Sequence, residues 1–298
     1  MLAFLPAVVL LLQAVISVHT ELVVAPVVVT DARGHHVGGL TRESFRIFDN
    51  GQLQPVAAFH HGDSPVTLGL IVDRSQSMRP KTQALLAAVT SLLRTSRTDD
   101  ELFAVDFNDA VSLALSAGRP FTNDAGELAA ALAAVRAEGR TALYDGVAAG
   151  LEHLERGRAE RRALVLVSDG GDNGSQRKYA DVVMLARRSD AVIYAIGLMG
   201  SSLTEEEEDA GLLRRLCRDT GGVAYFPKTD AETAAAAAAV ASDLREQYLL
   251  GFVPAERTDG RAFRKIEVTA SAPGLGRLRV RTRSGYIAAR DAVEKRQP

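Results

Sequence analysis

The sequence predicts an α/β fold in which a doubly wound, mostly parallel sheet is flanked by a small β-rich region built from both ends of the chain. Between residues 66 and 248, short apolar runs alternate with segments of helical periodicity. This alternation is typical of a parallel sheet covered by helices on both faces. The segments on either side show the period-two patterns of strands. We therefore divide the chain into a leader (1–20), a β flank (21–65), an α/β domain (66–248), a second β flank (249–290) and a tail (291–298).

Size and composition limit the possible functions. The 298 residues suffice for one α/β domain and an accessory part. A net charge of −2 gives no general attraction to nucleic acid or to anionic membranes. With no Trp and 5% aromatic residues, a base-stacking surface is not expected. The single cysteine, Cys217, excludes an internal disulfide and a multi-cysteine metal site, and we expect it to be a buried thiol.

The leader, residues 1–20, is almost wholly apolar, as in a secretory signal peptide. It carries no Lys or Arg before the apolar run, and its length approaches the ~20 residues of a membrane-spanning helix. A cleaved signal is the favoured interpretation, with a retained anchor and a soluble start as alternatives. We therefore expect an exported protein, periplasmic or extracellular, that contacts a membrane only through this segment.

Six strands and six helices are expected in the α/β domain. The strands are predicted at 67–73, 102–107, 111–116, 162–168, 191–197 and 223–226. The helices are predicted at 80–96, 124–137, 143–157, 176–189, 205–219 and 230–248. The second and third strands lie too close in sequence for a helical crossover, so we expect them to form an antiparallel hairpin at one edge of the sheet.

The two flanks are each too small for a good core, so we expect them to pack together or to pair with each other. In the first flank, Asn50-Gly51 between two apolar runs predicts a tight β-hairpin, because both turn positions need a positive φ. In the second, arginines alternate with apolar residues. We expect a solvated edge strand with one basic face, formed by Arg277, Arg279, Arg281 and Arg283.

Three oxygen-bearing side chains follow the first apolar strand, in the stretch "DRSQSM". Asp73, Ser75 and Ser77 alternate, so in an extended turn their side chains point the same way. They lie at the carboxyl end of a parallel strand, where α/β folds place ligands. Helix capping by Ser77 is the alternative, but it leaves Asp73 and Ser75 unexplained.

Further oxygens are expected at the same edge of the sheet. Asp169 follows another parallel strand in "LVLVSDGGDNG", and Thr141 lies in the loop "EGRTALYDGV" before a helix. Two carboxylates and three hydroxyls suit a hard divalent cation, Mg²⁺ or else Mn²⁺ or Ca²⁺. Because few protein charges face it, such an ion would accept a carboxylate from a partner.

These five positions resemble the metal-ion-dependent adhesion site of von Willebrand factor type A domains. The resemblance covers roughly residues 64–248 and implies a Rossmann-like fold and a metal-assisted protein contact. It implies that Ser75 and Ser77 ligate the metal directly, that Thr141 does so directly or through water, and that Asp73 and Asp169 act largely through water. The flanking stretches "GLTRESFRIFDNG" and "QYLLGFVP" also resemble an exported "VWFA-related" family of bacteria, common in acidobacteria.

The predicted function is therefore a non-enzymatic, divalent-metal-dependent adhesion or assembly module that binds a protein presenting an acidic residue. A metal-independent scaffold for envelope assembly is one alternative. A Mg²⁺-dependent phosphoryl-transfer hydrolase with Asp73 as nucleophile is another, although Ser75 stands where such chemistry needs a second acid. No glycine fingerprint follows the first strand and no G-x-S-x-G surrounds a serine, so dinucleotide binding and serine hydrolysis lack support.

Overall fold

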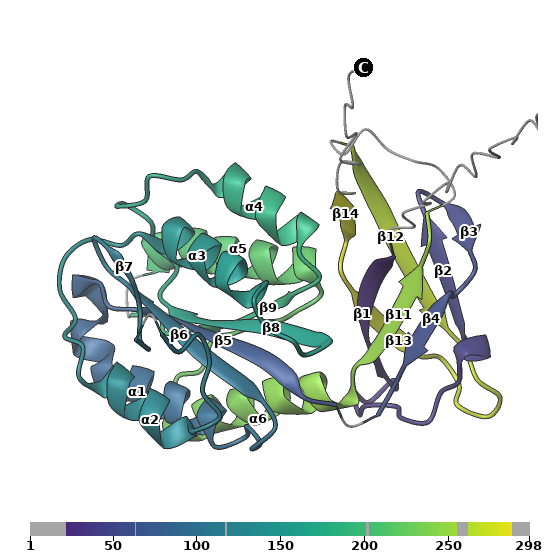
Figure 1. The fold of residues 1–298 in the computed structure, drawn as a ribbon, viewed down its shortest axis with the longest axis horizontal. Coiled ribbons are helices and arrows are strands. Elements are labelled where there is room, and N and C mark those ends of the chain that lie inside the picture. Colours follow the sequence, from purple (N-terminus) through teal and green to yellow (C-terminus); the bar gives the residue numbers. More distant parts are fainter. Residues whose placement is uncertain (1–21, 63, 117, 201–202, 255–261, 288–298) are drawn as a thin grey trace, which may run out of the picture.

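The computed structural model describes residues 22–62, 64–116, 118–200, 203–254 and 262–287, with side chains from 210 onward in the segment that starts at 203. The predicted leader and tail lie outside these residues. Within the described part of the chain, no helix is both long and apolar enough to cross a membrane. The chain forms an α/β layer structure beside a β-sandwich (Figure 1).

The central sheet has six strands in the order β10-β9-β8-β5-β6-β7. They are β5 (Val66–Asp73), β6 (Glu101–Phe107), β7 (Val111–Leu113), β8 (Arg161–Ser168), β9 (Val192–Gly197) and β10 (Ala224–Tyr225). The pairs of neighbouring strands are parallel except that β7 runs antiparallel to β6. The predicted mostly parallel sheet and its edge hairpin are both confirmed.

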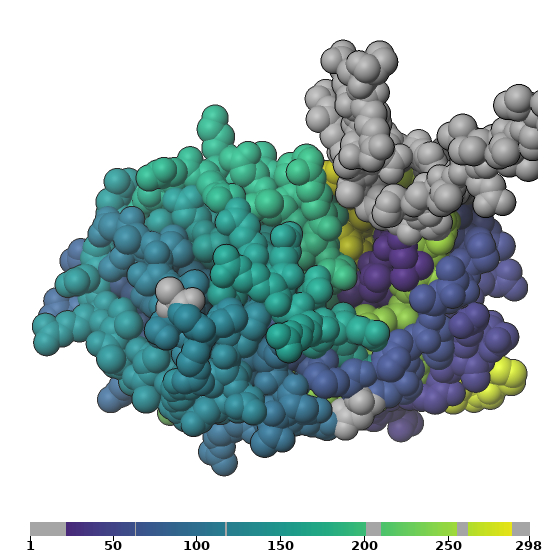
Figure 2. All heavy atoms as spheres, in the orientation of Figure 1, coloured from purple at the N-terminus to yellow at the C-terminus, as the bar shows by residue number. Residues whose placement is uncertain are grey.

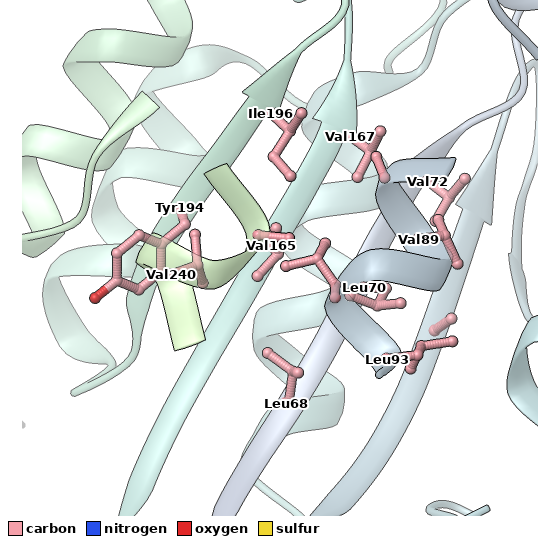
Figure 3. Packing of buried hydrophobic residues seen from close by; sticks show 14 of the residues in the cluster. Leu68, Leu70, Val72, Val89, Leu93, Val165, Val167, Tyr194, Ile196 and Val240 are labelled. Carbon is pink, nitrogen blue, oxygen red and sulfur yellow. The ribbon is translucent and has the colours of Figure 1, made fainter. Parts of the chain in front are cut away.

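Helices cover both faces of this sheet. One face packs against α1 (Thr82–Leu93), α2 (Ala125–Ala133) and α6 (Asp230–Glu246), and the other against α3 (Leu143–Leu154), α4 (Tyr179–Arg188) and α5 (Leu203–Thr220). All eight residues of β5 are buried, which explains its continuous apolar run. Leu70 and Val72 point toward α1 and α6, as Figure 3 shows, whereas Ile71 packs on the opposite face. Cys217 is buried in that second core, as predicted.

The helix predicted at 80–96 differs in the structure. The chain first forms a 3₁₀ helix, η2 (Gln76–Lys81), and α1 begins only at Thr82. Pro80 lies in η2, and proline cannot donate the backbone hydrogen bond that an α-helix interior requires. Ser77 lies inside η2 rather than at its start, and Ser75 occupies the N-cap position without a side-chain capping bond. The capping explanation for these serines is therefore wrong.

The two flanks pair with each other, as predicted. One antiparallel sheet has the order β13-β1-β11-β4 and the other the order β14-β12-β2-β3. Their strands are β1 (Val23–Thr30), β2 (Phe45–Asp49), β3 (Gln52–Gln54), β4 (Ala58–His60), β11 (Tyr248–Phe252), β12 (Phe263–Ala270), β13 (Arg279–Thr282) and β14 (Gly285–Ile287), with a short 3₁₀ turn η1 (Arg42–Ser44) before β2. N-terminal β1 lies between C-terminal β11 and β13, and apolar side chains of both sheets form one core. The predicted hairpin joins β2 to β3, with φ of +48° at Asn50 and +82° at Gly51.

The predicted basic face of the last strands is only half solvated. β13 is an edge strand, and Arg277 and Arg279 are exposed as expected. Arg281 instead binds Asp243 of α6 and donates to the Gly221 carbonyl (2.6 Å). Arg283 is buried and donates to the Arg187 carbonyl at the end of α4 (2.6 Å). The prediction failed because this edge faces the α/β part, which a strand pattern alone does not reveal.

A buried arginine forms hydrogen bonds to both segments that connect the sandwich to the α/β part. Arg161, the first residue of β8, is 0% exposed. Its guanidinium donates to the carbonyls of Gly62 (2.5 Å) and Gln247 (2.9 Å), which precede β5 and β11 respectively. The amino ends of the central strands therefore face the sandwich, and their carboxyl ends face away from it. Figure 2 shows the two parts in contact on this side of the molecule.

The sandwich core contains an ion pair whose removal should be costly. Asp49, at 0% exposed, accepts from Nε of Arg264 (2.9 Å) and from the Tyr286 hydroxyl (3.2 Å). We expect Arg264→Met to lower the free energy of unfolding by about 3–5 kcal/mol, because it leaves a buried carboxylate without its cation. Urea denaturation of the purified protein measures this. The control is Lys265→Met, which breaks the exposed pair with Glu267 on the same strand and should cost less than about 1 kcal/mol. Equal losses in the two variants would contradict the prediction.

Candidate metal centre

Three loops meet at the carboxyl ends of β5 and β8. The first continues β5 through residues 73–78, the second precedes α3 at 138–142, and the third follows β8 at 168–175. Backbone hydrogen bonds join the first two loops, from Gln76 N to the Gly139 carbonyl (3.0 Å) and from Glu138 N to the Arg74 carbonyl (2.8 Å). The parallel sheet thus brings residues far apart in sequence to one edge.

Asp73 is the buried centre of this arrangement, at 0% exposed. Its Oδ1 accepts from the Ser75 backbone N–H (2.9 Å), and its Oδ2 accepts from the Ser168 hydroxyl (2.6 Å). Burial raises the pKa of this carboxyl to about 6, and the hydrogen bonds from Ser168 and Ser75 oppose that rise only in part. The nearby charge of Asp169 raises it further. A cation beside this carboxyl would favour its ionised form.

The two serine hydroxyls lie together beside Asp73. Ser75 Oγ and Ser77 Oγ are 3.0 Å apart, with Ser75 buried and Ser77 exposed. At this distance one hydroxyl donates to the other. Neighbouring ligands of an octahedral Mg²⁺ are also separated by ~3.0 Å, given Mg–O distances of ~2.1 Å. The pair therefore fits two adjacent positions around such an ion without rearrangement.

Thr141 is held against the same edge by its backbone. Its N–H donates to Oδ1 of Asn173 (2.9 Å), and its carbonyl accepts from the backbone N–H groups of Asn173 (3.0 Å) and Gly174 (2.9 Å). The loop turns at Gly139, where φ is +79° and a Cβ would lie 1.9 Å from an oxygen of Asp109. Only glycine fits there. Thr141 is 5% exposed, and its main chain couples the second loop to the third.

Asp169 already has a cationic neighbour. Its Oδ2 lies 3.1 Å from Nζ of Lys81, and the two side chains are 14% and 20% exposed. The next residue, Gly170, takes a φ of +94° and donates its N–H to the Ser168 hydroxyl (2.9 Å). Ser168 therefore connects the Asp169 loop directly to Asp73. The Lys81 ammonium shows that this carboxylate attracts a cation.

The residues present fit a hard divalent cation. Asp73, Ser75 and Ser77 are in direct contact, Asp169 is close enough for its charge to act on Asp73, and Thr141 is tied to the same loops. Among the described residues, no group of three or more His, Cys, Asp or Glu side chains could hold a metal. Hydroxyl oxygens must therefore contribute to any site here, and a donor set of oxygen alone suits Mg²⁺, Mn²⁺ or Ca²⁺.

The part of the chain that forms this edge matches a known protein family. The family model of the von Willebrand factor type A domain matches residues 68–171, which include all five predicted site residues. The chain contains a von Willebrand factor type A domain. We call the central sheet with its covering helices the A domain below. Domains of this family are in general protein-interaction or adhesion modules. That the flanks place the chain in an exported bacterial subgroup stays a prediction.

Solved structures resemble the whole chain or its A domain. A von Willebrand factor type A protein from Catenulispora acidiphila is 11% identical, with a TM-score of 0.53, and the match covers 94% of this chain and 76% of that one. An aerotolerance-related membrane protein from Bacteroides fragilis matches at 13% identity and a TM-score of 0.49, over 60% of this chain and 98% of its own. The von Willebrand factor domain of the type V pili tip protein Mfa5 from Porphyromonas gingivalis matches at 14% identity and 0.45, over 60% and 95%. The first of these supports the shared fold. No curated protein sequence matches the chain.

Sequence reasoning missed several residues that hold the edge of the A domain together. Ser168 binds Asp73, and its position one residue before Asp169 was a usable signal. Arg74 is buried beneath the site and donates to the Leu132 carbonyl, and burial lowers the pKa of its guanidinium against the opposing charges of Asp106 and Asp73. Lys81, the last residue of the 3₁₀ helix η2, contacts Asp169, and no motif predicted this contact.

The raised pKa of Asp73 predicts a pH-dependent stability. Its folded-state pKa of about 6 exceeds its ordinary value of 3.8, so the folded protein binds a proton that the unfolded chain does not bind between these values. In EDTA, lowering the pH from 8 to 4 should therefore stabilise the wild type relative to Asp73→Asn by about 2 kcal/mol. Urea denaturation across this range measures the difference. Asp99→Asn, at an exposed position, is the control and should show no such trend. A pH-independent difference between wild type and Asp73→Asn would refute the assignment.

Proposed function

We propose that the A domain is a non-enzymatic protein-binding module that uses a divalent cation, Mg²⁺ or else Mn²⁺ or Ca²⁺. An acidic side chain of the partner protein completes the coordination of that ion. The observation that carries the proposal is the pair of hydroxyls, Ser75 Oγ and Ser77 Oγ, 3.0 Å apart beside a buried carboxylate. Their spacing matches the ~3.0 Å between neighbouring ligands of an octahedral Mg²⁺.

Each residue then has a distinct role. Ser75 and Ser77 are the direct ligands, and Thr141 is a third hydroxyl from the neighbouring loop. Asp73 acts through water, which agrees with both of its oxygens already accepting hydrogen bonds from Ser75 and Ser168. Asp169 also acts through water, from the loop after β8. Because the direct ligands are uncharged, the cation keeps its attraction for a carboxylate of the partner.

The hydrolase alternative fits the site less well. Asp73 would have to attack a phosphoryl group, yet it is 0% exposed and both of its oxygens are hydrogen-bonded. The residue two positions on is Ser75, which offers no second acid for the leaving group. A protein-binding role needs no such nucleophile and agrees with the general function of the family.

Removal of one direct ligand should weaken metal binding without unfolding the domain. We expect calorimetric titration of the metal-stripped protein with Mg²⁺ and with Mn²⁺ to give a saturable heat. Ser75→Ala should lower the affinity at least about tenfold, as one of two direct ligands is lost, while circular dichroism stays unchanged. Ser112→Ala, at an exposed position on β7, is the matched control and should bind as the wild type does. Absence of heat with either metal for the wild type would overturn the proposed site.

Binding of the partner protein should depend on the divalent cation. We propose that it is an exported or envelope protein, so the full chain serves as bait in an envelope extract with Mg²⁺ or with EDTA, and mass spectrometry identifies what is retained. A partner captured with Mg²⁺ and released by EDTA or by Ser75→Ala supports the proposal. Capture that is unaffected by both changes would favour a metal-independent scaffold instead.

A further inference from the structure

Lys81 occupies a position that the metal-site motif does not assign. Its Nζ lies 3.1 Å from Oδ2 of Asp169, and both side chains are largely buried. We propose that Lys81 is a built-in competitor of the divalent cation, which neutralises Asp169 in the metal-free domain and must give up this carboxylate when a cation binds. The inference rests on the proposed metal-binding function and adds a residue that sets how tightly the metal is held.

The local structure fixes the ammonium close to the ligands. Lys81 is the last residue of η2, the same 3₁₀ helix that contains Ser77. The short helix has six residues, so the lysine side chain and the serine hydroxyl start from one rigid segment. Arg79 lies on the same helix but is exposed. Of these two cations, the structure brings only Lys81 into contact with a predicted site residue.

The Lys81 ammonium and a divalent ion compete for the charge of Asp169. Water screens a largely buried ion pair far less than an exposed one, so the Lys81–Asp169 contact has appreciable strength. Lysine presents its charge as a compact ammonium group. A divalent ion near Asp169 would therefore be repelled by an ammonium on the same carboxylate. With no divalent ion, however, the ammonium offsets the mutual repulsion of Asp73 and Asp169, whose charge raises the pKa of Asp73.

The structure also provides space for a displaced ammonium. Lys81 lines a pocket of about 700 Å³ whose wall includes Phe226 and the carboxylate of Asp230. Arg214 and Lys228 line it as well, so Asp230 is the lining residue that offers a displaced ammonium an opposite charge. The lysine side chain has four flexible methylene groups, and the pocket that it lines gives it a space outside the contact with Asp169.

The test measures Mg²⁺ affinity by calorimetry on the metal-stripped full chain. Lys81→Met removes the competing charge and should bind Mg²⁺ about tenfold more tightly than the wild type. Lys81→Gln, a polar uncharged variant, should do the same, whereas Lys81→Arg, which keeps the charge, should remain near the wild type. Arg79→Met is the matched control and should leave the affinity unchanged.

A second experiment measures the thermal stability of the metal-free protein. In EDTA, Lys81→Met should unfold at a lower temperature than Lys81→Arg, because Asp169 loses its cation, and saturating Mg²⁺ should remove this deficit. A merely structural role for Lys81 would lower the stability with and without Mg²⁺ and would not tighten metal binding.

The outcomes separate this inference from the proposed function. If the wild type binds Mg²⁺ and both uncharged variants bind it equally or more weakly, the competition is refuted and the metal site stands. If only the uncharged variants bind, the competition is supported and the wild type does not use Mg²⁺ as proposed. If neither the wild type nor the variants bind, both ideas are overturned.

Discussion

The carboxylate of Asp73, at the end of a fully buried strand, holds together the loops that form the candidate site. One oxygen fixes the backbone of Ser75, and the other binds the hydroxyl of Ser168 at the end of the neighbouring strand. The group is completely buried, so its charge is costly in the interior, and the hydrogen bonds from Ser168 and Ser75 offset that cost only in part. In the proposed function, a cation beside Asp73 would offset this cost of burial by favouring the ionised carboxylate.

Much of the architecture could be predicted because it depends on local patterns. The continuous apolar run of β5 indicated a strand covered on both faces, and Asn50-Gly51 indicated a hairpin whose two positive φ values the structure contains. The alternation in "DRSQSM" indicated that Asp73, Ser75 and Ser77 lie together, and hydrogen bonds join Asp73 to Ser75 and Ser75 to Ser77, although Ser77 lies in a 3₁₀ helix and not in an extended turn. These features follow from the residue pattern within one short segment and from the direction of a parallel strand.

The features that the sequence did not reveal all depend on packing between distant segments. Arg281 and Arg283 alternate as if on a wet face, yet their partners are Asp243 and a carbonyl of α4. Lys81 contacts Asp169 from the end of a 3₁₀ helix that contains Pro80, where the sequence had indicated the start of an α-helix. A strand or helix pattern states which residues share a side, but it does not state which part of the protein covers that side.

The insertion of β1 between β11 and β13 has a mechanical consequence. The strands nearest both chain ends, β1 and β14, belong to the sandwich, and the A domain is inserted between its strands in the sequence. Tension applied between Val23 and Ile287 therefore loads the sandwich, where β1 is bonded along both of its edges. The A domain lies outside this line of force. The edge at the carboxyl ends of β5 and β8 would therefore keep its shape under tension until the sandwich itself gives way.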